Sequence, residues 1–300
     1  MRLRAERPGT RGSTVPDEEQ QQPAGHSGPR QRVRLLSRPS ARIVLIGVLA
    51  IGVVVTVTPA DSAAGDIASG LVRAVGHLTS SSQNGQDFTG TPAVGALFTT
   101  AGGKLGHHFC TASVVNSPHG DLVITAAHCV TGSAAGVVFV PGYHSGAAPY
   151  GIWTVTKIYA DAAWTSAANP DDDVAFLRVT QLGSIVPIED VTGAEQLETG
   201  TPAHQLVEVT GYPNATQVPI TCRNWTREPM ADQLEFDCGG YTDGTSGGPF
   251  LANVDPLTGQ GAVIGVIGGY EQGGDAPQIS YSAMFGTNVA ALYQTAVADG

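Results

Sequence analysis

The sequence predicts an all-β fold, because short apolar segments follow one another from about residue 88 onward. Gly, Pro, Asn and Asp separate these segments, which show hardly any helical periodicity. Regularly spaced short strands of this kind are typical of a β-barrel or a β-sandwich. The composition agrees with this class, since the 300 residues include 39 glycines and only 14% are charged.

Each expected strand is an apolar or β-branched segment bounded by turn-forming residues. The strands are expected at 94–99, 110–116, 122–125, 137–140, 153–159, 174–179, 205–211, 220–225, 233–238, 249–252, 262–267 and 279–283. One helix is expected at the end of the chain, over residues 289–298, with Asn288 as its N-cap. Its apolar positions recur at helical spacing and share one face: Val289, Leu292, Tyr293 and Ala296.

The N-terminal third differs in composition from the rest. Residues 1–42 contain nine arginines and four acidic residues among many Pro, Gly and Gln, so this basic region is expected to be disordered. An uninterrupted apolar run follows from 43 to about 58, and small residues come after it. We interpret 43–60 as the core of a cleaved signal peptide, with an uncleaved signal anchor as the main alternative and a buried helix as a third. The first two place the remaining chain outside the cytoplasm, secreted or membrane-anchored. Residues 61–87 then form a Ser- and Gly-rich connector or a short pro-segment.

Charge and motif content exclude several classes of partner. Beyond residue 42 the chain has six basic and 22 acidic residues, so a nucleic-acid partner is not expected. A membrane partner is expected only if the segment 43–58 remains as an anchor. The chain has no phosphate-binding loop and no zinc-type cysteine spacing, so we expect no cofactor and no metal. We expect a monomer.

All four cysteines lie in the part expected to be exported, which suits an oxidising compartment. Four cysteines allow three pairings. The pairings local in sequence join Cys110 to Cys129 and Cys222 to Cys238. Each closes a short loop, and such a bridge stabilises a fold by about 3 kcal/mol in the chain-entropy model. Buried free thiols are the alternative.

Three motifs together indicate nucleophilic catalysis. His128 follows an apolar strand in the string Ile-Thr-Ala-Ala-His-Cys, and Ser246 lies in Gly-Thr-Ser-Gly-Gly-Pro. A serine hydroxyl becomes an effective nucleophile when a histidine accepts its proton and a carboxylate orients that histidine. Three consecutive aspartates precede the strand Val-Ala-Phe-Leu, and we select Asp173 because it directly precedes this strand. Neighbouring side chains in an extended segment point in opposite directions, so Asp172 is the alternative. If Asp173 orients the histidine, Asp171 and Asp172 are expected to lie in a solvated turn, with a calcium site as the alternative.

These strings, over about residues 88–300, resemble the chymotrypsin-like (trypsin-type) serine protease family, and in particular its secreted bacterial branch related to glutamyl-endopeptidase-like enzymes. The resemblance implies two antiparallel six-stranded β-barrels, over about 88–185 and 186–300, followed by a C-terminal helix. It implies a serine endopeptidase acting on proteins or peptides. His128 would be general base and then acid, Asp173 would orient it, and Ser246 would form the acyl-enzyme. The backbone amides of Gly244 and Ser246 would form the oxyanion hole.

The resemblance also implies where substrate binds. Gly240 would lie at the bottom of the primary pocket and Tyr241 would trim it. An extended wall for the substrate backbone would contain Gly268, Gly269 and Tyr270. The uncharged pocket floor favours a small or apolar side chain at the cleaved position.

The chain departs from the animal digestive members of this family at two positions. Thr245 occupies the place where animal digestive members carry an aspartate that pairs with the freed N-terminus, so other contacts must hold the oxyanion loop. Thr242 replaces a cysteine of those members. His108, just before Phe109-Cys110, is expected to pack beside the site.

Three other functions remain as alternatives. A catalytically silent binding protein on a protease fold would have no use for these motifs. In an esterase or lipase the catalytic residues usually occur along the chain in the order Ser, Asp, His, with the serine in a strand-turn-helix elbow. This chain has the reverse order. A chaperone-protease needs a further peptide-binding module, for which the residues after Ser246 are too few.

Overall fold

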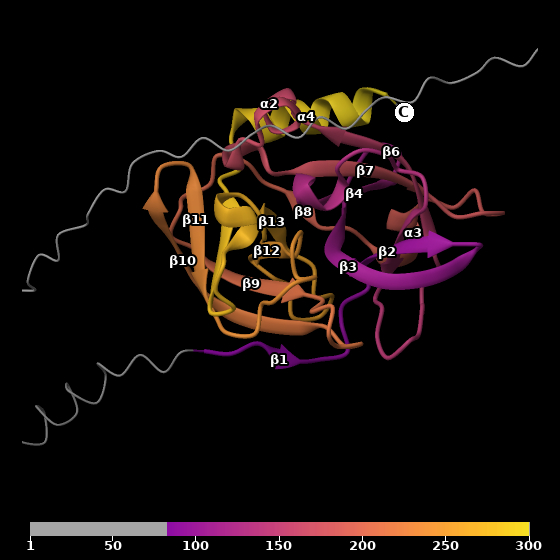
Figure 1. Ribbon diagram of the computed structural model, residues 1–300, viewed down its shortest axis with the longest axis horizontal. Coiled ribbons are helices and arrows are strands. Elements are labelled where there is room, and N and C mark those ends of the chain that lie inside the picture. The colour runs from indigo at the N-terminus through magenta and orange to yellow at the C-terminus, as the bar shows by residue number, and fades with distance from the viewer. Residues whose placement is uncertain (1–82, 300) are drawn as a thin grey trace, which may run out of the picture. The chain divides into compact units, whose positions relative to one another are not determined.

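The computed structural model describes residues 83–299 (Figure 1). The expectations for 1–42, 43–60 and most of 61–87 therefore fall outside the described residues. Within 83–299, no helix has the length and apolar character needed to cross a membrane.

The first barrel is a closed, antiparallel ring of six strands in the order β2-β3-β4-β7-β6-β5. Its strands correspond to the first six predicted from the sequence: β2 (Val94–Ala101), β3 (Lys104–Val115), β4 (Leu122–Thr125), β5 (Val137–Pro141), β6 (Trp153–Ala160) and β7 (Ala175–Thr180). Strand β3 begins six residues before its predicted start, in the hairpin that it forms with β2.

The second sheet contains the other six predicted strands and two short additions. The strands are β9 (Leu206–Gly211), β10 (Ile220–Met230), β11 (Gln233–Asp237), β12 (Pro249–Ala252), β13 (Ala262–Val266) and β14 (Ile279–Ala283). Two-residue strands extend the sheet: β1 (Gln86–Asp87) beside β10 and β8 (Gln196–Leu197) parallel to β13. The Gly268 amide donates to the Tyr281 carbonyl at 2.9 Å, which draws the chain after β13 towards β14 and wraps the sheet into the second barrel.

Alternation along the strands divides the core into a barrel interior and an interface. On β4, Val123 points into the first barrel, whereas Ile124 packs in the cluster shared with the second barrel. On β7, Leu177 and Phe176 divide in the same way. This follows from the period of two in a strand. Because both faces of β4 and of most of β7 are buried, apolar residues occur on both faces of each strand. The interface they create is where the predicted site residues meet.

The structure contains more helix than the sequence predicted. Helix α2 (Ala162–Ala167) begins at Asp161, whose carboxylate accepts from the Ala163 amide at 2.7 Å. Helix α3 (Ile188–Thr192) begins after Pro187. Both are too short to show periodicity in the sequence.

The C-terminal helix is confirmed as α4 (Thr287–Ala298), which packs against β6 and β7 (Figure 1). The prediction of Asn288 as its cap is wrong, because the N-cap is Gly286 and makes no side-chain cap hydrogen bond. The Asn288 amide instead donates to the Asp171 carbonyl at 3.0 Å and to the Asp172 carboxylate at 2.9 Å.

The residues just before 88, where the sequence places the start of the catalytic domain, also contact the second sheet. The Gly85 amide donates to the Gly239 carbonyl at 2.8 Å, and the Gly239 amide donates to the Gln83 carbonyl at 2.7 Å. The segment leading into β1 thus packs directly against the stretch that precedes the Ser246 loop.

Both sequence-local disulfides are formed. Cys110 on β3 pairs with Cys129, with 6.1 Å between their Cα atoms. Cys222 on β10 pairs with Cys238 after β11, with 6.7 Å between their Cα atoms. One bridge therefore lies in each barrel, which matches an oxidising compartment.

One buried carboxyl makes the fold pH-dependent. Glu195 is fully buried, and this burial raises the pKa of its carboxyl to about 8, against an ordinary 4.5. The Gly261 amide, 2.6 Å away, lowers this pKa, and the charge of Glu208 raises it. Between pH 4.5 and 8 the folded protein keeps a proton that the unfolded chain has released. The contribution of the protonated Glu195 carboxyl to the free energy of unfolding is therefore complete below about pH 4.5 and is lost as the pH rises through about 8.

We expect Glu195→Gln, which stays neutral at every pH, to raise the melting temperature relative to the parent, and by more at pH 9 than at pH 5. Thermal unfolding at pH 5, 7 and 9 measures this difference. The exposed Glu198→Gln is the matched control and should leave the pH dependence unchanged. Equal pH dependence of the parent and Glu195→Gln would contradict the expectation.

Candidate active site

The position of His128 follows from a short turn after β4. The turn is η1 (Ala127–Val130), and the His128 side chain is 12% exposed. A side chain at Gly268 would begin only 3.2 Å from the Ala126 Cβ, so the turn packs closely against Gly268. The next residue, Cys129, is bonded to Cys110 on β3, which ties the turn to the first barrel.

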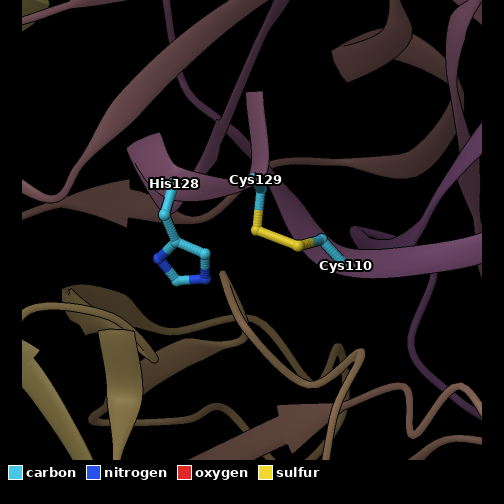
Figure 2. A group of neighbouring side chains, drawn as sticks. All are labelled: Cys110, His128 and Cys129. Carbon is cyan, nitrogen blue, oxygen red and sulfur yellow. A yellow bond between two sulfur atoms is a disulfide. The ribbon is translucent and has the colours of Figure 1, made fainter. Parts of the chain in front are cut away.

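Figure 2 shows the His128 ring beside this disulfide. Ligand atoms of Cys110, His128 and Cys129 lie within 4.8 Å of one another, a spacing that a metal site could have. Both sulfur atoms are already bonded to each other, so neither is a thiolate that could bind a metal. The group is a structural bridge next to a histidine.

Asp173 is the aspartate that faces His128. It follows η2 (Pro170–Asp172) and is fully buried. Its Oδ2 lies 2.7 Å from His128 Nδ1, and its Oδ1 accepts from the His128 backbone amide at 2.8 Å. The Gly269 amide donates to Oδ2 at 2.9 Å. A carboxylate with this many donors is held in one orientation, and it places the imidazole proton on Nδ1. In this tautomer His128 Nε2 carries no proton and can accept a hydrogen bond.

The other two aspartates have separate structural roles. Asp171 accepts from the Gln233 side chain at 2.7 Å. Asp172 accepts from Asn169 at 2.6 Å and from Asn288 at 2.9 Å. The expectation of a solvated turn is wrong for Asp172, which is only 9% exposed. Amide groups of Asn and Gln therefore satisfy the carboxylates that a calcium ion would have needed.

Ser246 lies in the loop between β11 and β12, half-buried, and lines the same cavity as His128. The backbone conformation of this loop requires glycine at position 247. Gly247 has φ +81°, and a Cβ there would lie 2.1 Å from Thr125 Oγ1 and 2.2 Å from the Thr111 carbonyl. Its amide donates to the Ile267 carbonyl at 2.7 Å, which fixes the loop against the chain after β13.

The amides of Gly244 and Ser246 are the ones expected to bind an oxyanion. Among residues 83–299, neither of these two N–H groups donates to another protein group. The Asn214 amide donates to the Asp243 carbonyl at 2.8 Å. Because C=O and N–H point in opposite directions across a trans peptide, this contact turns the Gly244 N–H away from Asn214. Gly244 itself has φ +95°, and its close approach to Tyr212 excludes a side chain.

Contacts within the loop hold the residue that precedes Ser246. Thr245 is buried, and both its hydroxyl and its amide donate to the Thr242 carbonyl, at 2.8 and 3.1 Å. His108 is buried beside this region, with its Nε2 3.0 Å from the Pro213 carbonyl. It thereby supports the segment that contains Asn214.

The cavity has a volume of about 1060 Å³. Of the five residues predicted to bind substrate, Tyr241 lines it, whereas Gly240, Gly268, Gly269 and Tyr270 do not. Gly268 and Gly269 instead lie against Asp173, where a Cβ on Gly268 would come within 3.0 Å of the carboxylate. Burial raises the pKa of the Tyr241 phenol, which donates to the Val209 carbonyl at 2.6 Å, so Tyr241 is a neutral wall.

Most of the cavity wall was not predicted from the sequence. The missed residues belong to the loop between β9 and β10, to η3 (Tyr270–Gly273), to the loop before β14 and to β14 itself, and include Asn214, Ala215, Glu271, Gln272, Gly273, Gly274, Asp275, Ala276, Pro277 and Ser280. The adjacent glycines at 273 and 274, both with positive φ, were the one sequence signal of a sharp turn here.

Comparisons with known proteins relate the chain to one family. The Trypsin family model matches residues 82–285. No curated protein matches the chain. The protease Anisep from Arthrobacter nicotinovorans is 28% identical, and the match covers 71% of this chain and 99% of that one, with a TM-score of 0.61.

Two further solved structures share the fold. A thermostable serine protease, AL20, from an extremophilic microorganism is 24% identical over 70% of this chain and 99% of its own, with a TM-score of 0.60. A Glu endopeptidase is 15% identical over 73% of this chain and 98% of its own, with a TM-score of 0.55. The family model covers more than half of the chain, and the fold, with its two barrels, is that of chymotrypsin-like proteases. The chain belongs to the trypsin family and is a serine endopeptidase.

Proposed function

We propose that this protein is a secreted serine endopeptidase in which His128, Asp173 and Ser246 form the catalytic triad. The contact that carries the proposal is the 2.7 Å pairing of His128 Nδ1 with the buried Asp173 carboxylate. It leaves Nε2 free on a residue that lines the same cavity as Ser246. A binding protein on the same fold would not need this pairing or two unbonded amides beside it.

The residues then act in a fixed order. Ser246 Oγ attacks the substrate carbonyl carbon while His128 Nε2 accepts its proton, and Asp173 stabilises the imidazolium. The amides of Gly244 and Ser246 donate to the oxyanion of the tetrahedral intermediate. The intermediate expels the amine, which takes the proton from His128 and leaves an acyl-enzyme on Ser246. Water attacks the acyl carbon with the same proton transfers, releases the acid and restores the serine.

Reaction with a fluorophosphonate tests the proposal directly, because only an activated serine is phosphonylated. We expect a single covalent adduct by intact-protein mass on the purified, disulfide-bonded protein, and no adduct on Ser246→Ala. A folded parent without an adduct would contradict the proposal and would favour the silent binding protein.

Secretion is supported by the two disulfides and by the apolar run at 43–58. N-terminal sequencing of the protein recovered from culture medium tests it. A mature N-terminus after residue 60 is expected, whereas recovery of the protein only in the membrane fraction would favour the anchored form.

Cleavage after a small or apolar side chain is supported by the uncharged part of the cavity. Ala276, Pro277 and Ile267 lie there with the neutral Tyr241. Cleavage after glutamate is disfavoured, because the residues lining this cavity include no Lys or Arg but do include the carboxylates of Asp243, Glu271 and Asp275.

These three exposed carboxylates also predict a charge preference. We expect peptides with Lys beside the cleaved bond to react faster than matched peptides with Glu, by about tenfold at low salt and less at high salt. The measurement is kcat/KM for the two peptides at 20 mM and 500 mM NaCl, with the peptides differing only at the flanking positions.

The triple variant Asp243→Asn, Glu271→Gln, Asp275→Asn should lose most of this preference. The matched control is Asp190→Asn, Glu198→Gln, Glu228→Gln, which removes three exposed acids that do not line the cavity. If both triple variants change the preference equally, the effect comes from net charge and not from the cavity.

A further inference from the structure

Thr111, on β3 of the first barrel, contacts both residues whose amides are proposed to bind the oxyanion. Its backbone amide donates to the Ser246 carbonyl at 2.7 Å, and its hydroxyl lies 3.0 Å from the Gly244 carbonyl. The residue is fully buried and does not line the cavity, so it cannot touch substrate. It acts only through the loop.

The direction of the hydroxyl hydrogen bond follows from its second partner. The Tyr212 backbone amide lies 2.9 Å from Thr111 Oγ1 and can only donate to it. The Thr111 hydroxyl proton is then free to be donated, and the Gly244 carbonyl is the acceptor within reach. The side chain therefore links an amide of the second barrel to a carbonyl of the Ser246 loop, from a strand of the first barrel.

The remaining polar group of Thr111 is also used. Its carbonyl accepts from Thr125 Oγ1 at 2.8 Å, at the end of the strand that leads to His128. The same residue is thus tied to the chain that presents the proposed base and to the loop that presents the proposed nucleophile.

Gly244 is the residue that most needs such a restraint. Glycine has access to more backbone conformations than any other residue, and rotation about Gly244 would turn its amide away from the cavity. Asn214 holds the peptide before Gly244 through the Asp243 carbonyl, and Thr111 and Thr242 hold the peptide after it through Gly244 O and Thr245 N. With both peptides held, φ at Gly244 stays at +95°.

We propose that Thr111 is the positioning residue of the oxyanion hole, taking part of the role that an N-terminal ion pair has in relatives with aspartate at position 245. The inference rests on the proposed function, since it concerns the amides that would stabilise the oxyanion. Loss of one oxyanion donor costs about 10²–10³ in kcat in other serine proteases, and a misplaced donor costs less.

The test compares Thr111→Val, Thr111→Ser and a matched control. Valine has the shape of threonine without the hydroxyl, whereas serine keeps the hydroxyl. The control is Thr226→Val, because Thr226 is also fully buried, accepts from the Gln205 amide at 3.1 Å and donates to the Ala203 carbonyl at 2.5 Å, outside the cavity lining. The measurements are the fluorophosphonate labelling rate, kcat and KM for one peptide, and the melting temperature.

We expect Thr111→Val to lower kcat and the labelling rate about 10- to 100-fold with KM within about threefold of the parent. Thr111→Ser should stay within about threefold in all three quantities because the hydroxyl remains. Thr226→Val should lower the melting temperature while leaving kcat within about threefold. Such a pattern separates positioning from stability, since only the loss of the Thr111 hydroxyl changes kcat.

Two results would overturn the inference: a kcat of Thr111→Val within threefold of the parent, or an equal loss of kcat in Thr226→Val. If Thr111→Val does not fold, Thr111→Ala replaces it, because the smaller side chain leaves room for water at the Tyr212 amide, and the same thresholds apply. A parent protein that forms no adduct at Ser246 would instead overturn the proposed function, so the two failures are distinguishable.

Discussion

Replacing Ser246 with alanine is expected to lower kcat for a peptide substrate by about 10⁴–10⁶-fold while leaving the fold intact. The variant removes the only atom that can form the acyl-enzyme, whereas the backbone contacts of the loop remain. Those contacts are made by the Ser246 carbonyl, which accepts from Thr111, and by the Gly247 amide, which donates to Ile267. We therefore expect the melting temperature to stay within a few degrees of the parent.

The matched control is Ser280→Ala, because Ser280 is a second, buried serine that lines the same cavity. It should keep kcat/KM within about tenfold of the parent, since no base faces it in the proposed mechanism. Turnover of Ser246→Ala within tenfold of the parent would remove Ser246 from the mechanism. If Ser280→Ala loses as much kcat/KM as Ser246→Ala, the assignment of Ser246 as the nucleophile would be contradicted.

Asp173→Asn is expected to have the next largest effect, a loss of about 10⁴-fold in kcat. An asparagine NH₂ group facing His128 Nδ1 forces that nitrogen to become an acceptor, which moves the imidazole proton to Nε2. Nε2 then cannot accept the proton of Ser246. The His128 backbone amide would keep the remaining side-chain oxygen as its acceptor, whereas the Gly269 amide, which donates to Oδ2 in the parent, would face the NH₂ group. Steady-state kinetics with a peptide ester, together with thermal unfolding, measure both consequences.

The neighbouring carboxylate provides the control. Asp172 is also buried, but within residues 83–299 its carboxylate accepts from the side-chain amides of Asn169 and Asn288 and not from His128. Asp172→Asn should therefore lower the melting temperature and keep kcat/KM within about tenfold of the parent. If Asp172→Asn loses as much activity as Asp173→Asn, the orienting role would belong to the whole turn and not to Asp173.

The expectations that depended on local sequence were the most accurate. Each of the twelve predicted strands is present, since alternation and turn residues are properties of a few neighbouring positions. The short helix α2 was missed because six residues are too few to show a period, although Asp161 at its start is a recognisable cap. Asn288 was assigned as a cap for the same local reason, yet its amide binds Asp171 and Asp172, more than a hundred residues away.

The candidate site also combines features that local sequence predicts with features that depend on the tertiary structure. The sequence by itself determined the residue types and their order, because a nucleophilic serine needs its glycines and a base needs its turn within a few positions. The sequence favoured Asp173 over Asp172, but only the tertiary structure decided between them, since the Asp173 carboxylate is held by the Gly269 amide, 96 residues further along the chain. The tertiary structure also placed Thr111 under the oxyanion loop, 133 residues before Gly244. Such contacts form when two barrels close on each other, and no local pattern of hydrophobicity or turn propensity encodes the pairing of residues so far apart.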